Sequence, residues 1–325
     1  MTGLIIAIGG VAGLVLISYL LEASRRAPSP PERLGWAPDV PIRSITVDGV
    51  RLRYIVAGDG PPLVLLHTLR TQLDMFQHVV PQLAGRFKVY ALDYPGHGYS
   101  DIPNVTYSAE YFVGVVAAFL DQLQIRNALV VGESIGGSIA LLLAARQHPA
   151  VARVLAVNPY DYDGGRGLRR ASLLSSLLFG VNDVPVLGAT VTRLRLFPIV
   201  RAVFEGGVER RGALSPALAR ELYRVGNRPG HYQAFMSLVR HWPSWERARA
   251  EYGKIGVPVL LLYGDHDWSR PAEREADARA IPGAQMRVAP NAGHFLSLDA
   301  PDEILQAVAD LSIGGPTSSP VTSGR

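Results

Sequence analysis

Residues 128–147 read ALVVGESIGGSIALLLAARQ, and this stretch decides the fold. Its first four residues form a short apolar run that suits a buried strand, and its last thirteen have a helix-forming composition. Between them, Gly132-Glu133-Ser134-Ile135-Gly136 predicts a sharp strand-to-helix turn, where glycines fit a strained and crowded backbone. Such a turn exposes the serine hydroxyl above the sheet, at the N-terminus of the following helix. The stretch therefore predicts a nucleophile at Ser134.

Strands and helices alternate on both sides of this turn. The predicted strands are residues 42–47, 50–57, 63–66, 88–92, 128–131, 151–157, 257–263 and 285–289. The predicted helices are residues 72–83, 107–123, 135–147, 271–280 and 301–311. Asp48-Gly49, between the first two strands, is a hairpin signal. The alternation predicts an α/β fold whose mostly parallel sheet carries helices on both faces.

The alternation stops between residues 161 and 247, where the pattern is helical and interrupted by glycines. A helical stretch inside a series of strands and helices indicates a cap inserted over the ligand-binding edge of the sheet. We therefore expect a core made of residues 42–160 and 248–313, with residues 161–247 as the inserted helical cap. Residues 314–325 are polar and are predicted to be disordered.

The N-terminus predicts a membrane anchor. Residues 3–21 contain no charge, and as a helix they would extend over roughly 28 Å, about one hydrocarbon core. Arg25 and Arg26 follow this stretch, which favours a retained transmembrane helix (residues 1–24) over a cleaved signal peptide. Residues 25–41 contain five prolines and suit an extended linker. With the arginines on the C-terminal side, we expect a single-pass membrane protein with a cytoplasmic catalytic domain.

A serine hydroxyl is a poor nucleophile near neutral pH and needs a positioned base. His294 follows the last predicted strand and precedes the last predicted helix, so it is the candidate base. Asp267, just past the strand at residues 257–263, is the candidate acid that fixes the imidazole tautomer. The order Ser134, Asp267, His294 is the one expected for a fold with this serine turn. Asp265 in the same loop and Asp161 after an earlier strand are alternative acids.

From about residue 42 to residue 312, the chain resembles the α/β-hydrolase superfamily, specifically its lidded branch of esterases, C–C bond hydrolases and cofactor-free perhydrolases. The motifs that carry the resemblance are His67 after its strand, residues 93–100 (DYPGHGYS), the serine turn, and the loops of Asp267 and His294. Sister enzymes that open epoxides or displace halide use Asp at the nucleophile position, so Ser134 argues against both activities. Asp93 and His97 are expected to be structural residues of their glycine-rich loop.

An acyl-transfer intermediate also needs N–H donors aimed at its oxyanion. One expected donor is the backbone N–H of Ile135, the residue after the nucleophile. The resemblance implies a second donor at the backbone N–H of Leu69. Thr68 departs from the family, which usually has glycine after the histidine. A β-branched residue restricts the backbone there, so the backbone N–H of Thr68 is the alternative donor. Arg70 is expected at the surface, with a substrate carboxylate as the alternative partner.

Composition excludes several classes of function. The chain of 325 residues has no cysteine, which excludes disulfides, thiolate zinc sites and a cysteine nucleophile. Its formal net charge is +4, and it lacks the long runs of like charge that would suggest a nucleic-acid partner. The predicted cap holds 13 Arg, no Lys and 7 Asp or Glu, and its basic residues lie beside the apolar run at residues 173–179. This suits a membrane interface or an anionic, lipid-like ligand, with a solvated cap surface over an ordinary apolar core as the alternative.

The function predicted from these features is a membrane-anchored serine hydrolase that cleaves a hydrophobic carboxylic ester through an acyl-enzyme. No metal or organic cofactor is needed for this reaction. C–C bond hydrolysis or perhydrolysis on the same fold is the alternative chemistry. The alternative of another class is a catalytically silent binding protein. The substrate, the acyl-chain length and the oligomeric state do not follow from the sequence.

Overall fold

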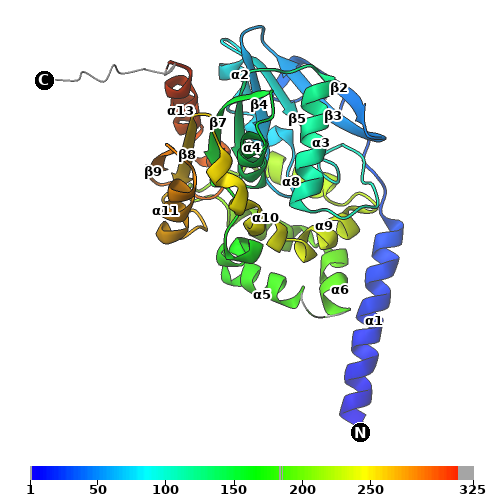
Figure 1. The fold of residues 1–325 in the computed structure, drawn as a ribbon. Coiled ribbons are helices and arrows are strands. Elements are labelled where there is room, and N and C mark those ends of the chain that lie inside the picture. Colours follow the sequence, from blue (N-terminus) through cyan, green and yellow to red (C-terminus); the bar gives the residue numbers. More distant parts are fainter. Residues whose placement is uncertain (1, 183, 185, 314–325) are drawn as a thin grey trace, which may run out of the picture.

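The structure is a computed structural model that describes residues 2–182, 184 and 186–313, with side chains from residue 9 to residue 312 (Figure 1). The predicted disordered tail, residues 314–325, lies outside this part of the chain. The described strands form one sheet in the order β1-β2-β3-β5-β4-β6-β7-β8-β9. Their bounds are β1 Arg33–Leu34, β2 Ala37–Val47, β3 Val50–Ala57, β4 Pro62–Leu66, β5 Lys88–Leu92, β6 Ala128–Glu133, β7 Val151–Val157, β8 Val259–Gly264 and β9 Gln285–Ala289.

The sheet is parallel from β5 to β9 and antiparallel only at its β1–β3 edge. Val47 pairs with Val50, so β2 and β3 are joined by the two-residue loop Asp48-Gly49. Both loop residues have positive φ, 48° and 79°, as a type I′ turn requires. The predictions of the hairpin and of a mostly parallel sheet are therefore confirmed.

Alternate residues of each central strand enter different halves of the core. Val64 and Leu66 of β4 belong to one apolar cluster, together with helices α3 (Ala109–Gln122) and α4 (Ile135–Ala145). Leu63 and Leu65 belong to a second cluster, on the other face of the sheet. The elements that pack there are η1 (Leu73–Phe76), α2 (Val80–Leu83), α12 (Leu296–Asp299) and α13 (Pro301–Ile313). Because both faces are covered, the central strands are apolar throughout and lack alternation with polar residues.

One predicted helix, residues 72–83, is in fact two short ones, η1 and α2. Pro81 lies in the first turn of α2, where its missing N–H costs nothing. An unbroken helix would need that N–H to bond Gln77, one turn earlier. At the other end, Leu73 N donates to the buried Asp93 carboxylate at 2.8 Å, so tertiary contacts fix where η1 begins.

Between β7 and β8 the chain forms a group of helices, which we call the cap (residues 161–247), and then returns to the core. The helices from β7 to β8 are η2 Asp163–Gly165, η3 Gly167–Arg170, α5 Leu173–Val181, α6 Leu187–Leu194, α7 Phe197–Glu205, α8 Pro216–Val225, α9 His231–Arg240, α10 Pro243–Ala248 and η4 Arg249–Lys254. Helix α11 (Pro271–Ala280) follows β8. The cap lies below the sheet in Figure 1, on the side where the N-terminal helix α1 (Thr2–Ser24) descends.

Helix α1 corrects one prediction. Among the residues that the structure describes, no helix is long and apolar enough to cross a membrane. The predictions of a transmembrane anchor and of a single-pass membrane localisation are wrong on this finding.

The C-terminal part of α1 instead packs against α6 of the cap through polar groups. Ser18 is fully buried and accepts a hydrogen bond from Arg193 Nε at 2.9 Å. Glu22 pairs with Arg195 at 2.5 Å and with Arg25 at 3.2 Å. The helix is therefore fixed to the protein along one side.

Candidate active site

The serine turn joins β6 directly to α4. Ser134 has φ 59° and ψ −120°, a left-handed conformation that a non-glycine residue adopts only when its surroundings enforce it. The two flanking glycines are required by space. A Cβ on Gly132 would lie 2.0 Å from the Gly136 carbonyl oxygen, and one on Gly136 would lie 2.1 Å from that of Leu66. The turn can therefore close on itself at Gly132 and press against β4 at Gly136 only without side chains at these two positions.

Three predicted side chains meet at the carboxyl ends of the parallel strands. His294 Nε2 lies 2.9 Å from Ser134 Oγ, and His294 Nδ1 lies 2.5 Å from Asp267 Oδ1. All three residues are buried. Serine, imidazole and carboxylate thus form one hydrogen-bonded row, in the geometry that allows the imidazole to accept the hydroxyl proton.

The Asp267 carboxylate is held in its charged form. Burial raises its pKa, but the His294 charge and the hydrogen bonds from His294 and Ser269 lower it further, so the pKa of Asp267 ends below its usual value. Both the N–H (3.0 Å) and the hydroxyl of Ser269 donate to Oδ2. Arg274 in turn donates to Ser269 Oγ at 2.9 Å. Trp268 stacks on the His294 ring, with centroids 3.7 Å apart and planes 12° apart, which fixes the plane of the imidazole.

Two buried residues that the sequence did not indicate tie the loops of this row together. The Asn158 side chain donates to the carbonyl oxygens of Gly293 (3.1 Å) and His294 (2.9 Å) and accepts from Gly264 N at 2.9 Å. It therefore joins the histidine loop to the end of β8. Glu133 accepts from the N–H and the hydroxyl of Ser297, each at 2.8 Å, and burial raises its pKa to about 7. The one available signal was position, since both residues lie at the carboxyl end of a predicted strand.

The alternative acids have other partners. Asp265 accepts hydrogen bonds from the N–H groups of Asn291 and Ala292, each at 3.0 Å, so it binds the loop backbone. The buried Asp161 accepts a hydrogen bond from Tyr252 at 2.5 Å. In the described part of the chain, neither carboxylate is hydrogen-bonded to His294.

The contacts of Asp93 and His97 support a structural role in their glycine-rich loop. Asp93 accepts from the N–H groups of Leu73 and Tyr99, each at 2.8 Å, and pairs with Arg53 Nε at 2.5 Å. His97 packs edge-on against Tyr94 and is buried, and burial lowers its pKa to about 3. An imidazole kept neutral in this way can serve as a packing group in the glycine-rich loop.

The loop after β4 approaches the serine from the other side. The Thr68 carbonyl oxygen accepts from Thr71 Oγ1 at 2.8 Å and lies 2.7 Å from His67 Nδ1. His67 Nε2 accepts from Tyr94 N at 3.3 Å, so the proton of the ring is on Nδ1. Burial lowers the pKa of His67 to about 4, which keeps the ring neutral. Arg70, in the same loop, has φ 58°, and its half-buried side chain lines a cavity. The predicted surface position of Arg70 is therefore wrong.

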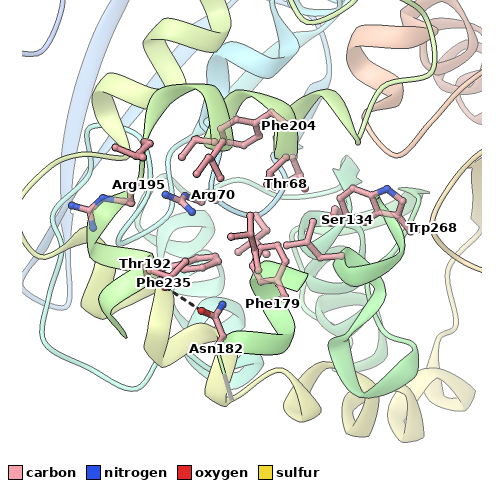
Figure 2. A pocket seen from close by; sticks show the side chains of 18 of the residues that line it. Thr68, Arg70, Ser134, Phe179, Asn182, Thr192, Arg195, Phe204, Phe235 and Trp268 are labelled. Atoms are coloured by element: carbon pink, nitrogen blue, oxygen red, sulfur yellow. Dashed lines mark hydrogen bonds between the residues drawn. The ribbon is translucent and has the colours of Figure 1, made fainter. Parts of the chain in front are cut away.

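The cavity encloses about 270 Å³ and begins at Ser134. Figure 2 shows Ser134 and Trp268 on one side of it and Arg70 and Arg195 on the other. Its lining is mostly apolar and comes mainly from the cap, with Thr68, Leu69, Arg70, Ser134, Tyr160, Leu168, Leu178, Phe179, Asn182, Val191, Thr192, Leu194, Arg195, Leu196, Ile199, Val200, Val203, Phe204, Phe235, Trp268 and Phe295. Across the described residues, no group of three or more His, Asp or Glu side chains is placed to hold a metal ion.

Comparison with known proteins identifies the family. A family model described as the alpha/beta hydrolase fold matches residues 61–301, about three quarters of the chain. The chain belongs to the α/β-hydrolase fold family. The match includes the serine turn and both loops that supply Asp267 and His294.

Relatives within the family have different activities. The chain is 31% identical, over 278 residues, to the dihydrolipoyllysine-residue acetyltransferase component of the acetoin cleaving system of Cupriavidus necator, covering 83% of this chain and 68% of that protein. The enol-lactonase of Burkholderia xenovorans LB400 superposes with a TM-score of 0.67 at 25% identity, over 84% of this chain and all of the enzyme. An N-acyl homoserine lactone degrading enzyme superposes with a TM-score of 0.66 at 26% identity, over 82% of this chain and 99% of that one. Together with the family match, these likenesses support a hydrolase.

Proposed function

We propose that the chain is a serine hydrolase that cleaves a hydrophobic carboxylic ester through an acyl-enzyme. The observation that carries this proposal is the hydrogen-bonded row of Ser134, His294 and Asp267 at one side of an apolar cavity. The row supplies a nucleophile with its base, and the cavity supplies room for an apolar substrate chain.

In this mechanism, His294 Nε2 takes the proton of Ser134 as Oγ attacks the ester carbonyl carbon. The ionised Asp267 holds the Nδ1–H of His294 and stabilises the imidazolium that forms. His294 then gives its proton to the departing alkoxide, which leaves as the alcohol. A water molecule, deprotonated by the same imidazole, attacks the acyl-enzyme and releases the carboxylic acid.

Two backbone donors are proposed for the oxyanion, those of Ile135 and Leu69. Ile135 begins helix α4, and the first N–H groups of a helix have no partner within the helix. The N–H of Leu69 belongs to the same peptide unit as the Thr68 carbonyl. Because that peptide is trans, its N–H points away from the carbonyl oxygen held by Thr71 and His67. This arrangement supports Leu69 over Thr68, whose N–H belongs to the preceding peptide.

The lining of the cavity supports an apolar ester rather than a small polar one. Leucine, isoleucine, valine and phenylalanine side chains make up most of its wall, so an apolar chain would be taken out of water there. The structurally similar enol-lactonase is named for a lactone substrate, and a lactone is a cyclic carboxylic ester, which supports the same class of bond as the target here.

Covalent labelling tests the nucleophile. A fluorophosphonate probe should label the wild-type protein and should not label Ser134→Ala, because the probe needs an activated serine. Ser138, a buried serine one helical turn further on, provides the matched control, and Ser138→Ala should still be labelled. Absence of wild-type labelling, or equal labelling of Ser134→Ala, would contradict the proposal.

A series of p-nitrophenyl esters with increasing acyl-chain length tests the substrate class. We expect kcat/KM to rise with chain length up to the length that the cavity holds, since each buried CH₂ contributes about 0.8 kcal/mol. A labelled serine with no esterase activity on any chain length would instead favour C–C bond hydrolysis.

A further inference from the structure

Arg70 is a cation in the substrate cavity that lacks a counter-ion. Within the described residues, its guanidinium forms no hydrogen bond or ion pair, although it has five N–H donors. Its one recorded contact is with the face of Phe235, where Cζ lies 4.7 Å from the ring centroid. Stacking of this kind uses the face of the guanidinium and leaves the donors along its edge available.

The charged groups around Arg70 add to the excess of positive charge at this side of the cavity. Arg195 lines the same cavity, and its Nη1 is buried without a hydrogen-bond partner. The nearby carboxylate, Glu22, is shared between Arg195 and Arg25. Burial, together with the positive charges of Arg195 and Arg25, lowers the pKa of Arg70 to about 9, so the group is still protonated at neutral pH. The lining of the described cavity contains no aspartate or glutamate.

The backbone conformation of Arg70 is also unfavourable. Its φ of 58° lies in the left-handed region, which is unfavourable for a residue with a side chain and persists where the surroundings enforce it. The preceding peptides are held by the contacts of the Thr68 carbonyl with Thr71 and His67. The loop that would supply the oxyanion donor thus directs the arginine side chain into the cavity (Figure 2).

We propose that Arg70 is the anion-binding residue of the substrate cavity, so that the ester carries an acidic group, a carboxylate or a phosphate, in addition to its apolar chain. This inference rests on the proposed esterase function. An acidic group that accepts two charge-assisted hydrogen bonds from Arg70 would satisfy guanidinium N–H groups that have no partner within the described residues. Arg195, which lines the same cavity, would add its positive charge on that side.

Two pairs of esters distinguish the possible acidic groups. The first pair is mono-p-nitrophenyl suberate, which has a free carboxylate at the far end of its acyl chain, and its neutral methyl ester. The second pair is 1-decanoylglycerol 3-phosphate and 1-decanoylglycerol. The scissile bond is the same within each pair, so the ratio of kcat/KM for the charged and neutral members measures recognition of the acidic group alone. A preference in the first pair indicates carboxylate recognition, and one in the second pair indicates phosphate recognition.

We expect the wild type to prefer the charged member of at least one pair. Arg70→Gln should reduce that ratio on the order of 10- to 100-fold, the usual range for a hydrogen bond to a charged group. Arg70→Lys should retain part of the preference, because the ammonium keeps the charge but not the planar fork. The matched control is Arg220→Gln, which removes an exposed arginine of α8 outside the cavity and should leave the ratio unchanged.

The ratio separates this inference from the proposed function. If Ser134-dependent hydrolysis of the neutral esters is seen but neither ratio exceeds one, or if Arg70→Gln keeps the wild-type ratio, the inference about Arg70 is wrong and the esterase proposal stands. If no ester is hydrolysed, calorimetric titration of Ser134→Ala with monomethyl suberate and dimethyl suberate tests Arg70 without turnover. Equal affinity for these two probes, in proteins with and without Arg70→Gln, would overturn the inference.

Discussion

The Thr68 carbonyl fixes the peptide unit that carries the proposed oxyanion donor, the N–H of Leu69. Its oxygen is held by the hydroxyl of Thr71 and the ring of His67, both buried. The orientation of the Leu69 N–H follows from those two contacts, since the peptide unit between them is planar. Thr71 and His67 therefore act as positioning residues in the proposed mechanism.

Replacing Thr71 by valine tests this role. The substitution keeps the shape of the side chain but removes the hydroxyl that donates to the Thr68 oxygen. We expect kcat to fall roughly 3- to 10-fold, the equivalent of one neutral hydrogen bond, with a smaller change in KM because the oxyanion forms only during the reaction. Steady-state kinetics on a p-nitrophenyl ester measures the split. Thr46→Val, at an exposed position of β2, is the control, and an unchanged kcat in Thr71→Val would argue against the role.

Among the elements, α1 has the most unusual position, because it packs on the cap rather than on the sheet (Figure 1). Its Glu22 carboxylate meets Arg195, whose side chain is 1% exposed and also lines the cavity. Burial and the neighbouring Arg25 lower the pKa of Arg195 to about 10, in spite of Glu22. The N-terminal helix thus supplies the charge that keeps a cavity residue in place.

Glu22→Gln should therefore weaken both folding and binding. We expect the free energy of unfolding to fall by about 1–3 kcal/mol, because Arg195 is left buried without a charged partner. KM for an ester should rise more than kcat falls, since Arg195 lines the cavity and does not touch the serine. Urea unfolding and kinetics measure the two effects. The control is Glu205→Gln, which breaks the exposed pair with Arg201 and should cost less than about 0.5 kcal/mol. Equal effects of the two variants would contradict the role of Glu22.

Elements were predictable from sequence where their pattern is local. The apolar composition of the core strands indicates by itself that they are buried. The Asp48-Gly49 pair likewise indicates the turn of the hairpin. The helix predicted at residues 72–83 failed because its break depends on Pro81 and on Asp93, which is distant in sequence. Hydropathy alone misjudged α1, whose polar contacts with Arg193 and Arg195 appear only when the cap is folded.

The residues of the candidate site also fall into those that the sequence predicts and those that it does not. Ser134, Asp267 and His294 follow predicted strands, and the carboxyl ends of parallel strands meet at one edge of a sheet. Asn158 could not be assigned from sequence, because its partners Gly264 and His294 are more than 100 residues away. Arg70 was placed at the surface because nothing in its local sequence shows that the cap closes over it.

At the scale of the whole molecule, a buried pair of carboxylates connects the start of the cap to the second part of the core. Asp161 follows β7 and Asp277 lies on α11, and each accepts a tyrosine hydroxyl, from Tyr252 and Tyr263 respectively. Burial raises the pKa of both groups, that of Asp277 to about 8 with a further contribution from the neighbouring Asp161, although Arg249 pairs with Asp277 at 2.8 Å and opposes the shift. The folded protein therefore keeps a proton near neutral pH that the unfolded chain releases near pH 4.

This proton makes stability depend on pH. Because the folded state binds more protons than the unfolded state between about pH 4 and pH 8, the free energy of unfolding should fall as pH rises through that window, by up to about 1.4 kcal/mol per pH unit. Asp277→Asn mimics the protonated acid and should flatten this slope. Urea unfolding at pH 5, 6, 7 and 8 measures it, with the exposed Asp59→Asn as control. The same slope in Asp277→Asn and in the wild type would rule out the shared proton.

The cavity wall and the reacting atoms come from different parts of the chain. Ser134, Asp267 and His294 belong to the core, whereas most of the apolar wall belongs to the cap. Substitutions in the cap can thus change the substrate specificity while the three reacting residues stay in place. Laboratory evolution of a new specificity should accordingly begin with a library confined to the wall positions of the cap, because most of its members will still be active enough to select.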